Sequence, residues 1–365
     1  MSVRHILGFL FFALCSPLHA EWQLALPGWQ YEFPKDHGIH PEFKTEWWYF
    51  TGNLTAKDGR EFGYQVTFFR QGVNSRDELI PLSRFVVHDL KFAHFALSDL
   101  SGRRFVFQQK LSRGTYQEAG FSQGTRLAWI EDWSCEMSSG GVFHLRGNTS
   151  DDAIDLSLTS LKAPAIHGQD GISQKASGEG RASHYYSLTR LQTAGRVKLG
   201  NDEFSVTGTS WFDHEWATNQ LSKDQVGWDW FSLQFEDGSE AMLFQLCLKE
   251  GGRDIHSGGT FVNAQGQITA IGNDDFSLEP VRWWVSPATK ARYPLEWNLT
   301  VPKLGIAVRI HAAMDNQELL LSPVSYWEGA IRVDGQLGNA AVRGKGYLEM
   351  TGYAGAMVGL QAGKH

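Results

Sequence analysis

Short alternations of apolar and polar residues, separated by glycine-rich turns, run along most of the chain. Examples of such alternation are residues 105–108, 143–146 and 307–311. Alternation with a period of two is the pattern of a β-strand with one buried face, and short strands at this spacing are typical of sandwiches and barrels. The longest helix candidate, 79–87, covers only a few turns. The pattern therefore predicts an all-β protein.

One hairpin pattern occurs twice. The segment Trp48-Tyr-Phe-Thr-Gly-Asn-Leu, followed by Asp58-Gly59, recurs as Trp228-Asp-Trp-Phe-Ser-Leu-Gln, followed by Asp237-Gly238. An apolar run follows each Asp-Gly pair. An aromatic strand, an Asp-Gly turn and a second apolar strand together predict a β-hairpin.

A second pattern also occurs twice, and in the same order relative to the hairpins. The segment 206–213 ends in Trp-Phe-Asp, and 342–349 ends in Tyr-Leu-Glu, with Gly at the third position of both. This alignment matches Asp213 with Glu349 and indicates an internal duplication.

The duplication divides the chain into two tandem antiparallel β-barrel domains. We expect the first barrel at 45–218 and the second at 225–355, with an N-terminal segment at 21–44, a linker at 219–224 and a tail at 356–365. Units of this length suit barrels of eight to ten strands, each able to hold one ligand.

The first twenty residues have the pattern of a secretory signal peptide. Arg4 and His5 precede an apolar run at 6–15, and small Ala20 precedes the expected cleavage site. A run this short cannot span a bilayer, which needs about 20 apolar residues. A lipoprotein would carry its lipid on Cys15, but the bulky Leu14 before it disfavours that processing. We expect a protein of the periplasm or the exterior, beginning at Glu21.

Composition and charge exclude several classes of function. The formal net charge of the 365 residues is −7, and acidic and basic residues are scattered, which disfavours a nucleic-acid interface. Cys135 and Cys247 lie in different halves of the chain, so free thiols are expected rather than a disulfide, and neither has the spacing of a zinc site. No phosphate loop or dinucleotide-binding fingerprint is present. We predict neither a metal nor a cofactor.

The strand that contains Trp228 and Trp230 carries large apolar groups on both faces, because Phe231 and Leu233 alternate with them. Both faces should therefore be covered. The tryptophans then belong either to the core or to the wall of a ligand cavity.

Asp213 is the first candidate for chemistry. It shares a strand face with Trp211 and Glu215, while His214 points the other way. It is either a buried, hydrogen-bonded carboxylate or a general acid whose pKa an apolar wall raises. Glu349 takes the matching position in the second unit. Further polar residues within aromatic strings are expected to be buried in ion pairs or hydrogen bonds; these are Glu46, Arg70, His184 and Glu328.

Three blocks of the chain resemble the AttH-like group, which includes the carotenoid 1,2-hydratases (hydroxyneurosporene synthases). They are 46–52, 210–216 together with 227–231, and 326–330 together with 344–353. The resemblance implies two lipocalin-like domains packed against each other, with affinity for apolar or polyene-like molecules. The aromatic residues expected to contact such a ligand are Trp48, Tyr185, Trp211, Trp228, Trp230, Tyr326 and Trp327.

Two functions fit these observations. The first is an exported protein that binds an apolar ligand such as a lipid, a polyprenoid or a polyene. The second is a cofactor-free lyase or isomerase that protonates an isolated double bond, with Asp213 as acid and aromatic rings beside the developing cation. An unpaired carboxylate in a closed cavity would favour the enzyme. Association with a membrane surface or an export complex, and the oligomeric state, stay open.

Overall fold

The computed structural model describes residues 22–73 and 87–356. The predicted signal peptide, nearly all of the helix candidate 79–87 and nearly all of the tail lie outside these residues. Helical structure in the described residues is limited to four short 3-10 turns: η1 (Lys35–His37), η2 (Thr115–Gln117), η3 (Asn273–Asp275) and η4 (Pro302–Leu304). None of the described helices is long and apolar enough to cross a membrane.

The first half of the chain forms one antiparallel sheet of 13 strands, ordered β4-β3-β2-β1-β13-β12-β9-β8-β7-β6-β5, with β10 and β11 paired to β12. The strands are β1 (Thr45–Ala56), β2 (Glu61–Gly72), β3 (Asp89–Asp99), β4 (Arg104–Ser112), β5 (Ala119–Phe121), β6 (Arg126–Ile130), β7 (Trp133–Met137), β8 (Val142–Asn148), β9 (Ala153–Ser160), β10 (Ala165–Ile166), β11 (Ser173–Gln174), β12 (Ala182–Leu199) and β13 (Asp202–Ala217).

The second half forms a sheet of ten strands, ordered β17-β16-β15-β14-β23-β22-β20-β19-β18, with β21 paired to β22. The strands are β14 (Gln225–Phe235), β15 (Glu240–Leu248), β16 (Gly258–Val262), β17 (Ile268–Ile271), β18 (Ser277–Val285), β19 (Arg292–Val301), β20 (Ile306–Ala312), β21 (Glu318–Leu319), β22 (Tyr326–Leu337) and β23 (Ala340–Met350).

The strand order confirms the predicted duplication. In both sheets the first strand of the unit pairs with the last, so that β4-β3-β2-β1-β13-β12 corresponds to β17-β16-β15-β14-β23-β22. Each sheet curls around its own apolar core and forms a near-barrel, as expected for tandem lipocalin-like domains. The first sheet exceeds the expected eight to ten strands because short strands such as β5, β10 and β11 add to it.

The residue matches within the duplication need correction. Counted from the equivalent hairpin turns, Trp228 matches Tyr49 rather than Trp48, and Glu349 matches Trp211 rather than Asp213. Sequence similarity slipped by one residue on the first strand and by two on the last. A slip of one residue reverses the face of a strand, so Trp48 and Trp228 point in opposite directions.

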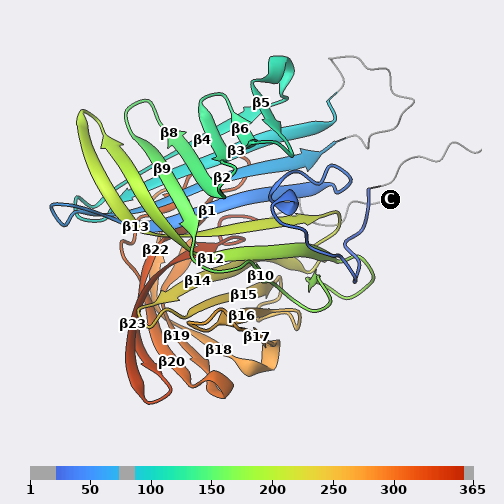
Figure 1. Cartoon of the computed structure of the whole chain (residues 1–365). Helices are drawn as coiled ribbons and strands as arrows, with labels where there is room; N and C mark the ends of the chain where they lie inside the picture. Colours follow the sequence, from blue (N-terminus) through green and yellow to red (C-terminus); the bar gives the residue numbers. More distant parts are fainter. Residues whose placement is uncertain (1–21, 74–86, 357–365) are drawn as a thin grey trace, which may run out of the picture.

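Alternation along the paired strands separates two environments. Trp48, Phe50 and Phe212 fill the first barrel, and Phe231 and Leu348 fill the second. Their neighbours on the opposite strand face point toward the other barrel and form a third apolar cluster, which contains Tyr49, Tyr185, Trp211, Leu221, Trp230, Met242, Phe244, Leu246, Ala330 and Tyr347. Figure 1 shows this arrangement: the blue-to-green sheet lies against the orange sheet, and β1, β12 and β13 lie near their junction.

The two barrels approach each other closely. A Cβ atom on Gly63 of β2 would lie 2.8 Å from Cβ of Ala330 on β22, so only glycine permits this spacing. Polar contacts surround the apolar cluster: Lys162 and Arg190 of the first barrel both bind Glu240 of the second, which is fully buried. The barrels therefore share a continuous interface that contains both apolar and charged groups.

Candidate functional site

The face between the barrels gathers tyrosine and tryptophan rings from both domains. Trp230 meets Tyr49 edge to face at 5.2 Å between ring centroids and meets Trp211 at 6.1 Å. Its indole Nε1 donates to the Tyr185 hydroxyl at 3.1 Å. Trp228 lies half-buried at the border of this cluster. The rings form an apolar wall that carries several hydroxyl and indole groups.

Asp213 lies within this wall and is 3% exposed. Its Oδ1 accepts from Trp211 Nε1 at 2.6 Å and from the Ser187 hydroxyl, and its Oδ2 accepts from the Tyr185 hydroxyl at 2.6 Å. Burial raises the pKa of Asp213 to about 7, although these three donors favour the charged form. The carboxyl group is both hydrogen-bonded, as the first interpretation predicted, and protonatable near neutral pH, as the second predicted.

A pair of carboxyl groups in the other barrel lies within electrostatic range of Asp213. Glu328 on β22 and Glu349 on β23 are direct cross-strand partners, and their side chains lie on the face toward the first barrel. Burial, together with the charges of Asp213 and Glu215, raises the pKa of Glu349 to about 8, although a hydrogen bond with Trp228 opposes this effect. Burial also raises the pKa of Glu328 well above its ordinary value, and the charge of Glu349 adds to this effect. The site therefore favours the protonated form of both carboxyl groups.

Several buried polar atoms of this site lack a hydrogen-bond partner in the described part of the chain. They are both carboxyl oxygens of Glu328 and the hydroxyls of Tyr49 and Tyr347, although the hydroxyls of Tyr49 and Tyr326 lie close enough to Glu328 to favour its charged form. Glu328 is fully buried. Buried polar groups are nearly always hydrogen-bonded, because leaving one unpaired costs about 1–3 kcal/mol. The hydrogen-bonding capacity of these groups is therefore available to a molecule bound beside the aromatic rings.

One buried cation borders the site. Lys175 Nζ lies 3.2 Å from Glu215 Oε1 and stands over the rings of Tyr185 and Phe244, at 5.0 and 4.4 Å from their centroids. Lys175 and Glu215 are both buried. Because Lys175 pairs with Glu215, it leaves Glu328 and Glu349 without a cationic partner that would hold them ionised.

The structure brings most of the predicted site residues together, with two exceptions. Trp211, Trp228, Trp230, Tyr185 and Tyr326 face the other barrel, as do Asp213 and Glu349. Trp48 and Trp327 do not: they point into the barrel cores, where their indoles donate to the carbonyl oxygens of His37 and Asp315. The cause is strand alternation, which puts Trp327 on the opposite face from Tyr326 and Glu328.

Glu328 has no ion-pair partner among the described residues; its carboxyl group lies near the hydroxyls of Tyr49 and Tyr326, which favour its charged form without meeting strict hydrogen-bond geometry. The sequence feature that could have marked Glu328 as a site residue is its position between Trp327 and Gly329 in an aromatic segment. The prediction for Glu46, Arg70 and His184 is confirmed, since Arg70 Nε lies 3.2 Å from Glu46 Oε2 and His184 Nδ1 lies 2.9 Å from the Gly171 carbonyl oxygen. Cys135 and Cys247 are free thiols, as expected.

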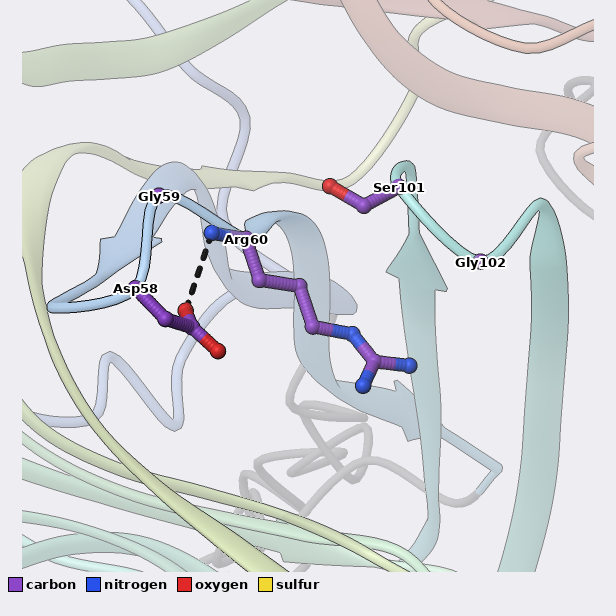
Figure 2. A pocket seen from close by; sticks show the side chains of 5 residues that line it. All are labelled: Asp58, Gly59, Arg60, Ser101 and Gly102. Atoms are coloured by element: carbon purple, nitrogen blue, oxygen red, sulfur yellow. Dashed lines mark hydrogen bonds between the residues drawn. The ribbon is translucent and has the colours of Figure 1, made fainter.

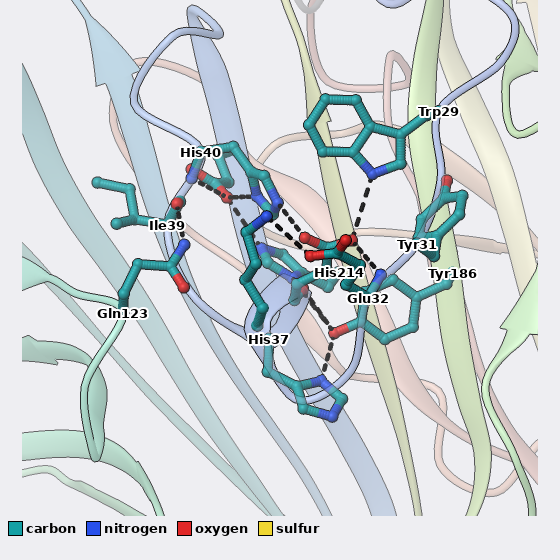
Figure 3. A network of polar contacts seen from close by, with 12 residues as sticks. Trp29, Tyr31, Glu32, His37, Ile39, His40, Gln123, Tyr186 and His214 are labelled. Atoms are coloured by element: carbon teal, nitrogen blue, oxygen red, sulfur yellow. Dashed lines mark hydrogen bonds and ion pairs between the residues drawn. The ribbon is translucent and has the colours of Figure 1, made fainter.

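A separate polar network closes one end of the first barrel (Figure 3), where the segment 22–44 covers the strands. Glu46 Oε1 lies 2.8 Å from His40 Nδ1 and 3.0 Å from His214 Nε2, and His40 Nε2 lies 3.3 Å from Asp36. Burial opposes charge here, yet hydrogen bonds to Asp36 and Glu46 raise the pKa of His40 to about 9. The Arg70 guanidinium group forms ion pairs with the carboxylates of Glu46 and Asp89.

The three groups His40, Glu46 and His214 have ligand atoms within 4.8 Å of one another. Their hydrogen bonds are nevertheless already satisfied: Glu46 accepts from both rings, from the His40 backbone N–H and from Arg70. A metal ion would have to displace the bound protons while next to the Arg70 guanidinium. We interpret this network as an ion-paired plug that ties the N-terminal segment to the barrel.

A shallow surface hollow of about 500 Å³ lies at the turns after β1 and β3 (Figure 2). It is lined by Asp58, Gly59, Arg60, Ser101 and Gly102. Arg60 is already bound there by Asp99, with Nε 3.0 Å from Oδ1. The hollow is open to solvent, and its lining includes none of the buried carboxyl groups described above. We therefore do not take it as the candidate site.

Comparisons with known proteins agree with this architecture. The family model described as AttH-like matches residues 24–353. The crystal structure of an AttH homologue from Nitrosomonas europaea is 32% identical, covers 91% of this chain and 99% of its own, and has a TM-score of 0.81. No curated protein matches the chain.

Two solved structures with lower identity share the fold. Kievitone hydratase from Nectria haematococca is 13% identical, with a TM-score of 0.70 over 92% of this chain and 98% of its own. CghA, solved with Sch210972, is 11% identical, with a TM-score of 0.56 over the same shares of the two chains. At these identities the similarity shows the two-barrel fold and nothing finer.

Proposed function

Since this chain belongs to the AttH-like family, we propose that it is a cofactor-free lyase or isomerase that acts on an apolar, unsaturated ligand held between its two barrels. The observation that carries this proposal is the cross-strand pair Glu328 and Glu349, which has no cationic partner among the described residues. Burial raises the pKa of both groups, that of Glu349 to about 8. A carrier needs no acid. A protonated carboxyl group beside aromatic rings is what protonation of an isolated double bond requires.

Glu349 is the proton donor in this proposal. It is half-buried at the border of the site, whereas Glu328 is fully buried behind it, so a ligand that enters the interface reaches Glu349 first. Asp213 is less suited to this role because three donors already occupy its oxygens. Its charge acts instead on Glu349, whose pKa it raises.

The chemical step balances without a cofactor. The Glu349 proton forms a C–H bond with one alkene carbon and the π electron pair, which leaves a cation on the other carbon. The faces of Trp228 and Trp230 stabilise this cation. A water molecule adds its oxygen to the cation and returns a proton to the Glu349 carboxylate, so that the net change is addition of water. Loss of a neighbouring C–H proton instead gives an isomer.

The hydratase among the structural relatives supports this reaction type by its printed name alone. We further propose that the chain is exported and that its ligand is a lipid, polyprenoid or polyene derived from a membrane. The wall of Tyr49, Trp211 and Trp230 suits an apolar ligand, and the Tyr hydroxyls suit one that carries or acquires a hydroxyl group.

The test compares Glu349→Gln with the wild type, using lycopene and the apolar lipid extract of the host as probes. Turnover should fall by roughly a hundredfold or more, the usual scale for loss of an acid catalyst, while probe binding is kept. Glu296→Gln is the control, because Glu296 is a half-buried glutamate of the same barrel, on β19, and it should turn over normally. A wild-type protein that binds a probe and releases it unchanged under all conditions would make this chain a carrier.

A further inference from the structure

A chain of four buried side chains runs from Asp213 to the other barrel. The Ser187 hydroxyl contacts Asp213 Oδ1, and His167 Nε2 lies 2.6 Å from Ser187 Oγ. His167 Nδ1 lies 2.8 Å from Thr260 Oγ1 on β16 of the second barrel. None of the four residues is more than 3% exposed. The middle of the chain is therefore shielded from solvent, and its two ends, Asp213 and Thr260, are nearly so.

Every link of this chain can reverse its direction. With Asp213 ionised, Ser187 donates to Asp213, His167 donates through Nε2–H to Ser187, and the Thr260 hydroxyl donates to Nδ1. With a proton on Asp213 Oδ1, Asp213 donates to Ser187, Ser187 donates to a bare Nε2, and Nδ1–H donates to Thr260. Each bond has one donor and one acceptor in both states, because hydroxyl groups can both donate and accept.

The surroundings of Asp213 place its proton on Oδ1 rather than on Oδ2. Oδ2 faces the Tyr185 hydroxyl, which already accepts from Trp230 Nε1. A proton on Oδ2 would make Tyr185 accept twice and leave its own O–H without an acceptor. Trp211 Nε1, which also contacts Oδ1, is a donor only and cannot reverse. Ser187 is the remaining contact that can accept the Asp213 proton.

His167 serves as a neutral element of the chain. Burial, together with the nearby charge of Lys175, lowers its pKa to about 3, so the ring does not become charged near neutral pH. The other titratable groups around Asp213 are Tyr185 on β12, Glu215 on β13 and Glu349 on β23. Lys175 is paired with Glu215. The Tyr185 ring lies 4.2 Å from the ring of His167, and this contact leaves both ring nitrogens to Ser187 and Thr260.

We propose that His167, Ser187 and Thr260 form a proton relay that ends on Asp213. When Asp213 takes up a proton by this route, Ser187 passes its hydroxyl proton to Asp213 Oδ1, His167 passes its Nε2–H proton to Ser187, Thr260 passes its hydroxyl proton to Nδ1, and a water molecule that reaches Thr260 replaces that proton, so that His167 exchanges its Nε2–H tautomer for the Nδ1–H tautomer. His167 is thus a positioning residue of the inter-barrel site, acting through Ser187 on the charge of Asp213 and so on Glu349. The relay rests on the proposed function in that Asp213 belongs to the same site. It also links the protonation state of that site to the contact between the barrels.

The relay is tested by nitrogen NMR of the full chain labelled with ¹⁵N-histidine, titrated from about pH 5 to about pH 9. The His167 signals are identified by their loss in His167→Gln. The expected result is complete exchange of the protonated nitrogen from Nδ1 to Nε2 with a midpoint near the pKa of Asp213, about 7, while the ring stays neutral. A single tautomer across the whole range, or a protonated ring, overturns the relay.

Two variants separate the relay from simple burial of His167. Asp213→Asn removes the titrating group, and Ser187→Ala removes the link, so each should leave His167 in one tautomer at all pH values. A pH-dependent tautomer in either variant would contradict the relay. Glu349→Gln should keep the tautomer exchange and lose turnover. Turnover that survives in Glu349→Gln therefore refutes the proposed acid, whereas a fixed His167 tautomer in the wild type refutes the relay.

Discussion

Replacement of Asp213 by asparagine should change stability by an amount that depends on pH. The wild-type carboxylate accepts from Ser187 and Trp211 on one oxygen and from Tyr185 on the other. An asparagine oxygen can accept from two of these donors, but its amide group then faces the third. One buried donor loses its acceptor, which costs about 1–3 kcal/mol.

The carboxyl group itself adds a pH dependence that asparagine lacks. Its pKa rises from 3.8 in the unfolded chain to about 7 in the folded protein. Folding therefore favours the protonated form. The resulting stability is fully present below the unfolded pKa and is lost as the pH rises through the folded pKa. The loss amounts to about 4 kcal/mol in the free energy of unfolding, at about 1.4 kcal/mol for each pKa unit.

These two effects predict a change of sign. At about pH 4.5 Asp213→Asn should be less stable than the wild type by about 1–3 kcal/mol, and at about pH 8.5 it should equal or exceed the wild type. Urea denaturation at the two pH values measures this difference. Asp202→Asn, an exposed change on the same strand, should shift stability little at either pH. A penalty for Asp213→Asn that is the same at both values would refute the assignment of a raised pKa.

Three further predictions address other parts of the molecule. Glu349→Gln should lower the pKa of Glu328, since the charge of Glu349 contributes to raising it; ¹³C NMR of labelled carboxyl groups measures this, and an unchanged pKa would mean that the two groups do not interact. Arg70→Met should destabilise the protein by about 3–5 kcal/mol, because it leaves Glu46 and Asp89 buried without their cation; thermal melting beside the exposed control Arg196→Met tests this, and equal melting of the two would contradict the plug. The exported protein should begin at Glu21, as N-terminal sequencing of the periplasmic fraction would show, and an intact Met1 in the cytoplasm would count against export.

The architecture was predictable because it depends on patterns with a short period. Alternation within strands and the repeated Asp-Gly hairpins were enough to identify two all-β units. The same alternation assigned Trp211 and Asp213 to one face and His214 to the other, and the structure confirms this. Local sequence could not fix the register between the repeats, because the similarity of Trp48 to Trp228 is a similarity of residue type, and the turns alone determine which residues are equivalent.

The site was less predictable because it is built from contacts between the barrels. Asp213 and Glu349 were recognised, but the alignment treated them as copies of one structural position, whereas they lie on facing surfaces. For Glu328 the sequence leaves an ion pair and a hydrogen bond equally open, since no sequence feature shows that its face of β22 meets the Tyr49 hydroxyl rather than a cation. His167 lies in the loop between β10 and β11, where no periodicity marks it.

The most direct test of the account is the fate of a ligand in oxygen-18 water. The wild type and Glu349→Gln are incubated with the apolar lipid extract of the host in H₂¹⁸O, and the products are examined by mass spectrometry. The wild type should give a product that carries one oxygen-18 atom and one added pair of hydrogens, or, when the reaction is run in D₂O, an isomer with solvent-derived hydrogen. Glu349→Gln should give neither product. A ligand that binds between the barrels and is recovered without any atom from solvent would contradict the proposed acid chemistry.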